Sequence, residues 1–157
     1  MRRPRLVLAV IVAVLALGFT SIAATTALCT APAAPAEAQL ASTELGPGTG
    51  VVGLSLSVSC PPLSSVVYVD ASVEINGTTP ANVVHIHAGD GRVLFTLFEN
   101  TQNPASNGRI VDQRFLTFGR DDLRAAICSD TAYVEVHSGS GTTPVLKGAL
   151  HPLGTKC

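Results

Sequence analysis

The sequence predicts an all-β fold, an antiparallel sandwich or barrel of about seven strands with one short helix near residues 119–129. Three observations predict it. Apolar and polar side chains alternate along several short segments, and turn-forming residues separate those segments. The composition combines 46% hydrophobic residues with only 4% aromatic ones, as expected for many short strands rich in Val, Leu and Ile. With 157 residues, the chain is long enough for one domain with a single modest core.

The N-terminal segment, residues 1–38, is predicted to be a secretory signal peptide. Residues 1–5 carry positive charge, residues 6–17 are continuously apolar, and small residues follow up to Ala38, which is the layout of such a peptide. A secreted or cell-surface location outside the cytoplasm follows from this layout.

The cleavage site is open to more than one interpretation. Ala36 and Ala38 form the best pair of small residues for a cut after residue 38, and earlier cuts after Ala24 or Ala27 also fit. Residues 6–28 are long enough to span a membrane, so an uncleaved anchor is the alternative. We expect membrane contact only through this segment.

Residues 39–48 are predicted to be a linker, because the surrounding stretch is rich in Ala, Pro, Thr and Gly. The folded domain is then expected to span residues 49–157. Its strands are segments of alternating or continuous apolar character, at 52–58, 67–75, 83–87, 92–98, 109–118, 131–137 and 144–150. Proline after Cys60 and the Asn76-Gly77 and Asp90-Gly91 turns end three of them.

The predicted helix interrupts the strand pattern between residues 119 and 129. Leu123, Ala126 and Ile127 are spaced as neighbours on one helix face. Asp121 and Asp122 stand where carboxylates stabilise a helix N-terminus.

Several function classes have no support in the sequence. The formal net charge of −1 provides no basic surface for nucleic acid. The chain contains neither a Gly-x-Ser-x-Gly nucleophile elbow nor a phosphate-binding loop. We therefore expect a protein that is not an enzyme.

The histidines offer one candidate site. His85 and His87 are two residues apart on one predicted strand and share a face, and His137 shares a face with Glu135 on another. If those two strands pair, three imidazoles and a carboxylate converge, a set that would suit Zn²⁺ or Cu²⁺. The alternative, which we favour at this point, is that these histidines are hydrogen-bonded parts of the architecture and that no cofactor is bound.

Four segments resemble the CHRD domain, the repeated module of chordin that also occurs singly in secreted bacterial proteins. They are VHIHAG from Val84, GRVL from Gly91, AYVEVH from Ala132 and KGAL from Lys147, in the order and spacing of the family. The sequence departs from the family pattern where Glu135 replaces the usual Asn and where Lys147 replaces Arg.

The resemblance implies an immunoglobulin-like antiparallel sandwich and an extracellular setting. We therefore expect an exported, non-catalytic domain with a binding or cell-surface structural role, whose partner is an extracellular protein or surface ligand. The alternative is a metal-binding domain, remotely similar to copper–zinc superoxide dismutase. That enzyme needs more histidine ligands than this chain supplies, because only His151 remains outside the candidate set.

Export makes disulfides possible, and Cys60, Cys128 and Cys157 are the candidates. If the first and last strands run parallel, as in many immunoglobulin-like sandwiches, all three lie at one pole and any two of them could bond. Cys29 belongs at the other pole, and a cut after Ala38 would remove it.

Overall fold

The structure is a computed structural model that describes residues 30–59, 66–100, 102–139 and 143–154. Within these ranges it consists of antiparallel strands and one short helix. The strands are β1 (Thr30–Ser42), β2 (Thr49–Ser59), β3 (Val66–Asn76), β4 (Ala81–His87), β5 (Val93–Glu99), β6 (Gly108–Phe118), β7 (Tyr133–Ser138), β8 (Thr143–Ala149) and β9 (His151–Pro152). The helix is α2 (Asp121–Cys128), at the place where the sequence predicts one.

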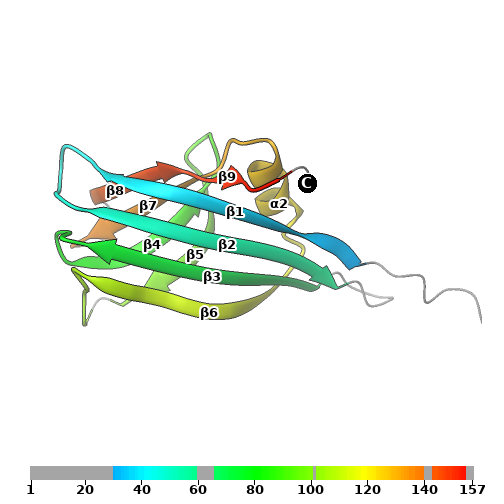
Figure 1. The fold of residues 1–157 in the computed structure, drawn as a ribbon, viewed down its shortest axis with the longest axis horizontal. Coiled ribbons are helices and arrows are strands. Elements are labelled where there is room, and N and C mark those ends of the chain that lie inside the picture. The colour runs from blue at the N-terminus through cyan, green and yellow to red at the C-terminus, as the bar shows by residue number, and fades with distance from the viewer. Residues whose placement is uncertain (1–29, 60–65, 101, 140–142, 155–157) are drawn as a thin grey trace, which may run out of the picture.

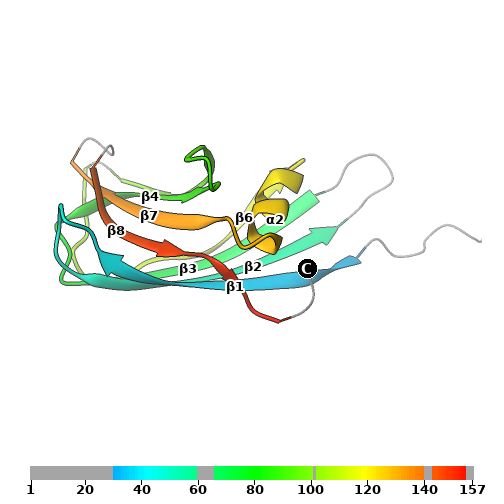
Figure 2. The same cartoon turned by 90° about the horizontal axis from the view of Figure 1, so that it is seen from above.

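The strands belong to one continuous sheet in the order β5-β4-β7-β8-β1-β2-β3-β6, and β9 adds to β1. The sheet curls over, so that β1, β2, β3 and β6 lie in front of β8, β7, β4 and β5 (Figures 1 and 2). A ladder of two residue pairs, Ala41 with Lys147 and Ser42 with Leu146, joins the two layers. The far edges also approach each other, since the rings of Phe95 on β5 and Phe115 on β6 meet edge to face at 5.4 Å.

This arrangement agrees with the predicted antiparallel β class but differs in detail. The described residues form nine strands rather than about seven. The layers are parts of one nearly closed sheet, so an immunoglobulin-like sandwich of two separate sheets is not confirmed.

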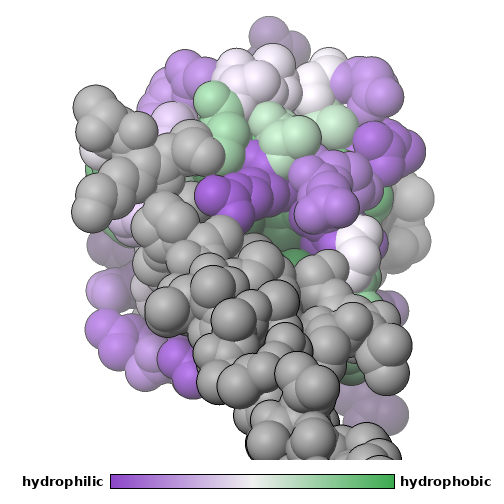
Figure 3. Space-filling view, turned by 90° about the vertical axis from the view of Figure 1, so that its right-hand side faces the viewer, coloured by the Kyte–Doolittle hydropathy of each residue, from purple (hydrophilic) through white to green (hydrophobic). Residues whose placement is uncertain are grey.

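The core lies between the two layers and consists of one cluster of aliphatic side chains. Strands of the front layer contribute alternate residues such as Leu54 and Val69, and strands of the back layer contribute Ile86 and Val134. The helix covers one end of this core with its buried residues, which are the three predicted from the spacing: Leu123, Ala126 and Ile127. Where Figure 3 shows the described surface at this end, it is mostly hydrophilic, with smaller hydrophobic patches between.

Strand β1 occupies residues that the sequence assigned to the signal peptide and linker. It pairs along β2 on one side and with β8 and β9 on the other. Ala36, Ala38 and Leu40 point into the core and are at most 3% exposed, while Glu37 and Gln39 lie on the opposite face. The prediction that residues 39–48 are a linker is therefore wrong for 39–42, and the folded part begins no later than Thr30.

A cut after Ala38 would remove nine of the thirteen residues of β1, Thr30–Ser42. A signal peptide therefore stays a prediction, but the cuts that fit the fold are the earlier ones, after Ala24 or Ala27. These positions lie outside the described residues. Within the part of the chain that the structure describes, no helix is long and apolar enough to cross a membrane.

Of the three candidate cysteines, Cys128 lies at the end of α2, and the structure holds it in a disulfide rather than as a free thiol. Cys60 and Cys157 lie outside the described residues, so the pairing stays a prediction. Ser59, the neighbour of Cys60, is opposite Val66, which in turn is opposite Phe118 just before α2. This register brings the chain next to Cys60 to the same end of the sheet as the helix that carries Cys128.

Candidate metal centre

The two histidine strands are neighbours, so the condition on which the candidate site depends is met. β4 and β7 pair antiparallel, with His85 opposite Glu135, His87 opposite Tyr133 and Val83 opposite His137. The next strand, β8, places Lys147 opposite Glu135. The site therefore consists of adjacent positions on three strands whose register is held by backbone hydrogen bonds.

The cluster lies on the face of the back layer that points away from the main core. Val84 and Ile86 on β4 enter the core, and the alternate positions carry the histidines. This outer face is nevertheless well covered, because only 7% of His87 and 5% of His137 is exposed. His85 is partly exposed and forms the solvent side of the cluster.

The three imidazoles are arranged as they would be around one small ion. Each of His85, His87 and His137 offers a ring nitrogen, and these atoms lie within 4.8 Å of one another. Their ring centroids are 5.2, 5.7 and 6.0 Å apart. Three imidazoles bound tetrahedrally to one Zn²⁺ through bonds of ~2.0 Å would hold their centroids about 5 Å apart, so small shifts would complete the site.

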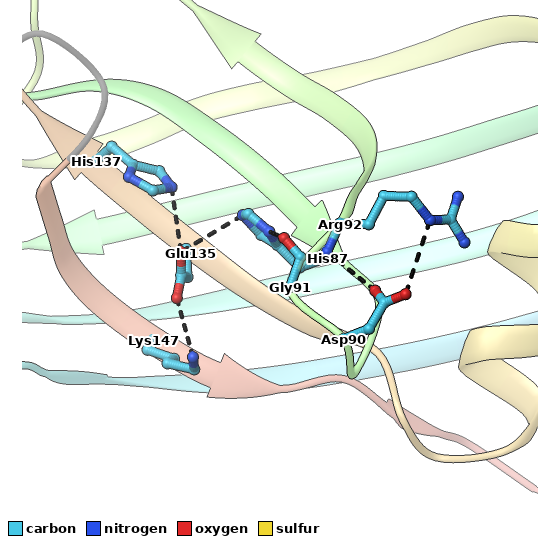
Figure 4. Close-up of polar contacts among 7 residues, drawn as sticks. All are labelled: His87, Asp90, Gly91, Arg92, Glu135, His137 and Lys147. Atoms are coloured by element: carbon cyan, nitrogen blue, oxygen red, sulfur yellow. Dashed lines mark hydrogen bonds and ion pairs between the residues drawn. The ribbon is translucent and has the colours of Figure 1, made fainter.

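Glu135 lies between two of the histidines (Figure 4). Its Oε2 is 3.5 Å from Nε2 of His87 and 3.4 Å from Nε2 of His137. Its other oxygen, Oε1, accepts a hydrogen bond of 2.9 Å from Nζ of Lys147. The carboxylate is thus directed by the lysine on one side and faces the imidazoles on the other.

Several buried ring nitrogens of the cluster have no hydrogen-bond partner. They are Nε2 of His87 and both Nδ1 and Nε2 of His137. Leaving a buried polar atom unpaired costs about 1–3 kcal/mol. Unpaired nitrogens on two neighbouring rings are what a protein shows where an ion or a proton completes the interactions.

The hydrogen bond of His87 selects its tautomer. Its Nδ1 lies 3.0 Å from the carbonyl oxygen of Gly91, and because a carbonyl only accepts, Nδ1 carries the hydrogen and donates it. In the neutral ring Nε2 then has a free lone pair directed at the cluster. A backbone carbonyl that orients a histidine in this way is the usual support behind a metal ligand.

The fold favours neutral rings at His85 and His137. Burial is the main cause that lowers the pKa of His137; Glu135 raises it in part, and His85 and His87 lower it further. Burial also lowers the pKa of His85, followed by the effect of His87, with smaller opposing effects of Glu99 and Glu135. The hydrogen bond to Glu135 raises the pKa of Lys147. At neutral pH the cluster therefore presents lone pairs from His85 and His137 rather than imidazolium ions.

Other side chains hold the cluster in place. The ring of Tyr133 stacks on His87 with centroids 5.0 Å apart and an angle of 6° between the planes. Nζ of Lys147 lies over the same phenol ring, 3.8 Å from its centroid. The turn that carries Gly91 is linked to the helix, because Arg92 forms an ion pair of 3.2 Å with Asp122.

All four residues predicted for the site, His85, His87, His137 and Glu135, come together. The sequence did not assign roles to Lys147 or to the carbonyl of Gly91, since both depend on a strand register and a turn geometry that alternation does not reveal. The fourth histidine, His151, does not join the cluster and pairs with Asp130 at 2.8 Å.

Comparisons with known proteins identify no relative of this chain. No protein-family model, curated protein or solved structure matches this chain.

Proposed function

We propose that this protein is an exported, non-catalytic domain that binds one divalent transition-metal ion, Zn²⁺ or Cu²⁺, through His85, His87 and His137. The observation that carries the proposal is that one ring nitrogen from each of the three histidines lies within 4.8 Å of the others, while buried nitrogens of His87 and His137 have no hydrogen-bond partner. Imidazole nitrogen is a preferred ligand of both ions.

A proton is the competing occupant of the cluster, and it explains less. One proton can join one ring nitrogen to Glu135 and leaves the other nitrogens unpaired. On His85 or His137 it would also reside on a ring whose burial lowers the pKa and disfavours the charged form. A divalent ion takes one nitrogen from each of the three rings at once, which pairs one buried nitrogen of His87 and one of His137, and it is attracted by the carboxylate.

The resemblance to the CHRD domain supports the setting of this proposal. Its four motif segments fall on β4, the start of β5, β7 and β8, which are consecutive strands in the sheet. The motif residues therefore form one layer, and the histidine cluster lies on its outer face. We propose that this layer is the CHRD-like, immunoglobulin-like part of the molecule and that it acts at the cell surface, where its partner is an extracellular protein or surface ligand.

Metal analysis of the purified protein tests the function. We expect about one Zn²⁺ or Cu²⁺ per chain after metal removal, reconstitution and dialysis, and at least ~10-fold weaker binding by His87→Ala, because loss of a ligand exceeds the effect of losing a supporting residue. His151→Ala is the matched control, since His151 lies outside the cluster, and it should bind as the unchanged protein does. Absence of stoichiometric metal in the reconstituted protein would refute the proposal.

A further inference from the structure

We infer that Glu135 Oε2 is the fourth ligand of the site, so that the protein holds Zn²⁺ in a closed, four-coordinate site that fastens β4 to β7. This inference rests on the proposed metal-binding function and specifies the metal, its coordination and its role.

The position of Oε2 matches a corner of a zinc tetrahedron. Ligand atoms bound to Zn²⁺ at ~2.0–2.1 Å with tetrahedral angles are about 3.4 Å apart. Glu135 Oε2 is 3.5 Å from His87 Nε2 and 3.4 Å from His137 Nε2. Two edges of the coordination polyhedron are therefore already in place, and the third histidine, His85, offers a ring nitrogen within 4.8 Å of the other two.

The contact between Oε2 and a neutral His87 ring places two acceptor atoms 3.5 Å apart. Because His87 Nδ1 donates to Gly91, the neutral ring directs a lone pair, not a hydrogen, at a carboxylate oxygen with lone pairs of its own. Two acceptors that face each other in a buried site repel one another. An ion between them converts the repulsion into two coordination bonds.

Lys147 determines which oxygen is available. Its ammonium group binds Oε1 at 2.9 Å, and the backbone register fixes the two residues opposite each other on neighbouring strands. Oε2 alone is then turned towards the histidines, so the carboxylate is set to coordinate through one oxygen. Lys147 is thus a positioning residue for the ligand.

The arrangement fits zinc better than copper and a structural role better than a catalytic one. Three nitrogens and one oxygen at tetrahedral spacing suit Zn²⁺, whereas Cu²⁺ prefers a tetragonal arrangement. Four protein ligands leave no position for a reactive water, which is the feature of structural zinc sites. All four ligands come from β4 and β7, so the ion adds a link between these strands beyond their hydrogen bonds.

Cobalt substitution tests the coordination, because Co²⁺ reports its geometry through its visible absorption. We expect the full chain loaded with Co²⁺ to show the intense bands of a tetrahedral ion, which Zn²⁺ then displaces. In Glu135→Gln these bands should weaken or shift, and the affinity for Zn²⁺ should fall by ~10–100-fold. Glu74→Gln on the exposed face of β3 is the matched control and should leave both unchanged.

The possible results separate this inference from the function on which it rests. Stoichiometric Co²⁺ with weak five- or six-coordinate bands that Glu135→Gln does not alter would overturn the fourth ligand and leave the three-histidine function intact. No binding of Co²⁺ or Zn²⁺ would overturn both. Circular dichroism of each variant without metal verifies folding, and if Glu135→Gln does not fold, Glu135→Asp takes its place, with a shifted cobalt spectrum as the expected result.

Discussion

His137 has an unusual environment, because both of its ring nitrogens are buried and neither forms a hydrogen bond, although Nε2 lies 3.4 Å from Glu135 Oε2. In most proteins a buried histidine has at least one hydrogen-bond partner. Here the fold places it beside two other imidazoles and a carboxylate and lowers its pKa chiefly by burial. Without an ion, the residue reduces stability locally, which is common at functional sites.

The lowered pKa values of His85 and His137 predict how the metal-free protein responds to pH. The ordinary pKa of a histidine is 6.5, and in the folded state the pKa values of both residues lie below it. Well above pH 6.5 both histidines are neutral in the folded and in the unfolded chain, so they do not lower the stability of the fold. As the pH falls below 6.5, the unfolded chain takes up protons that the folded state does not, so stability decreases until the folded pKa values are passed.

Urea unfolding of the protein in the presence of a chelator checks this prediction between pH 8 and pH 5. We expect the midpoint to fall with pH, and to fall less in His137→Gln. The exposed His151 serves for comparison, and His151→Gln should keep the full dependence on His85 and His137. A midpoint that is constant or rises towards pH 5 would contradict the assignment of neutral histidines.

At the level of residues, the sequence could predict the partners of the cluster but not its surroundings. Two-residue spacing was enough to place His85 with His87, and Glu135 with His137, on common faces. The register that brings Lys147 opposite Glu135 could not be predicted, because alternation is the same in every register that differs by two residues. Nor does alternation show that the outer face is covered.

Among the secondary-structure elements, β1 differs most from expectation. Its alanine and proline content is typical of linkers, yet Ala36, Ala38 and Leu40 alternate with Glu37 and Gln39 as in any half-buried strand. The chain after Lys147 runs very close to β1, because a side chain on Gly148 would collide with the backbone of Gln39. The alanine- and proline-rich composition of β1 therefore pointed to a linker, although its alternating residues are those of a strand packed in the sheet.

A pair of leucine substitutions tests whether β1 is part of the folded core. Leu40 is 3% exposed on β1, and Leu45 is 62% exposed in the turn that follows. Leu40→Ala should lower the free energy of unfolding by about 2–5 kcal/mol, because it leaves a cavity. Leu45→Ala should change it by no more than about 0.5 kcal/mol. Equal, small effects in chemical denaturation would contradict a structural β1.

For the molecule as a whole, one short ladder decides between two architectures. Two separate sheets and one curled sheet bury the same alternate residues, so hydrophobic patterning predicts both equally well. They differ here by the pairing of Ala41 and Ser42 with β8 and by the hydrogen bond from the amide of Thr43 to the carbonyl of Val145. The antiparallel class was predictable from sequence, and the continuity of the sheet was not.

The place of β1 in the whole fold also predicts where the mature chain must begin. A protein that starts at Thr30 keeps the entire strand, and one that starts at Gln39 lacks two of its buried alanines, Ala36 and Ala38. We expect the first to unfold cooperatively and the second to lack a cooperative transition in thermal circular dichroism. Mass spectrometry of the protein expressed from its full sequence should accordingly find a start at or before Thr30, and a start at Gln39 would contradict this expectation.

The same strand controls the order in which the chain can fold. β1 is synthesised first among the described strands, yet one of its edges is completed by β8 and β9, and Thr43 bonds to Pro144 across a separation of 101 residues. Contacts this distant must overcome a large loop-closure entropy, which slows folding of such topologies to milliseconds or longer. The second edge of the leading strand can therefore be completed only after the trailing strands have been synthesised.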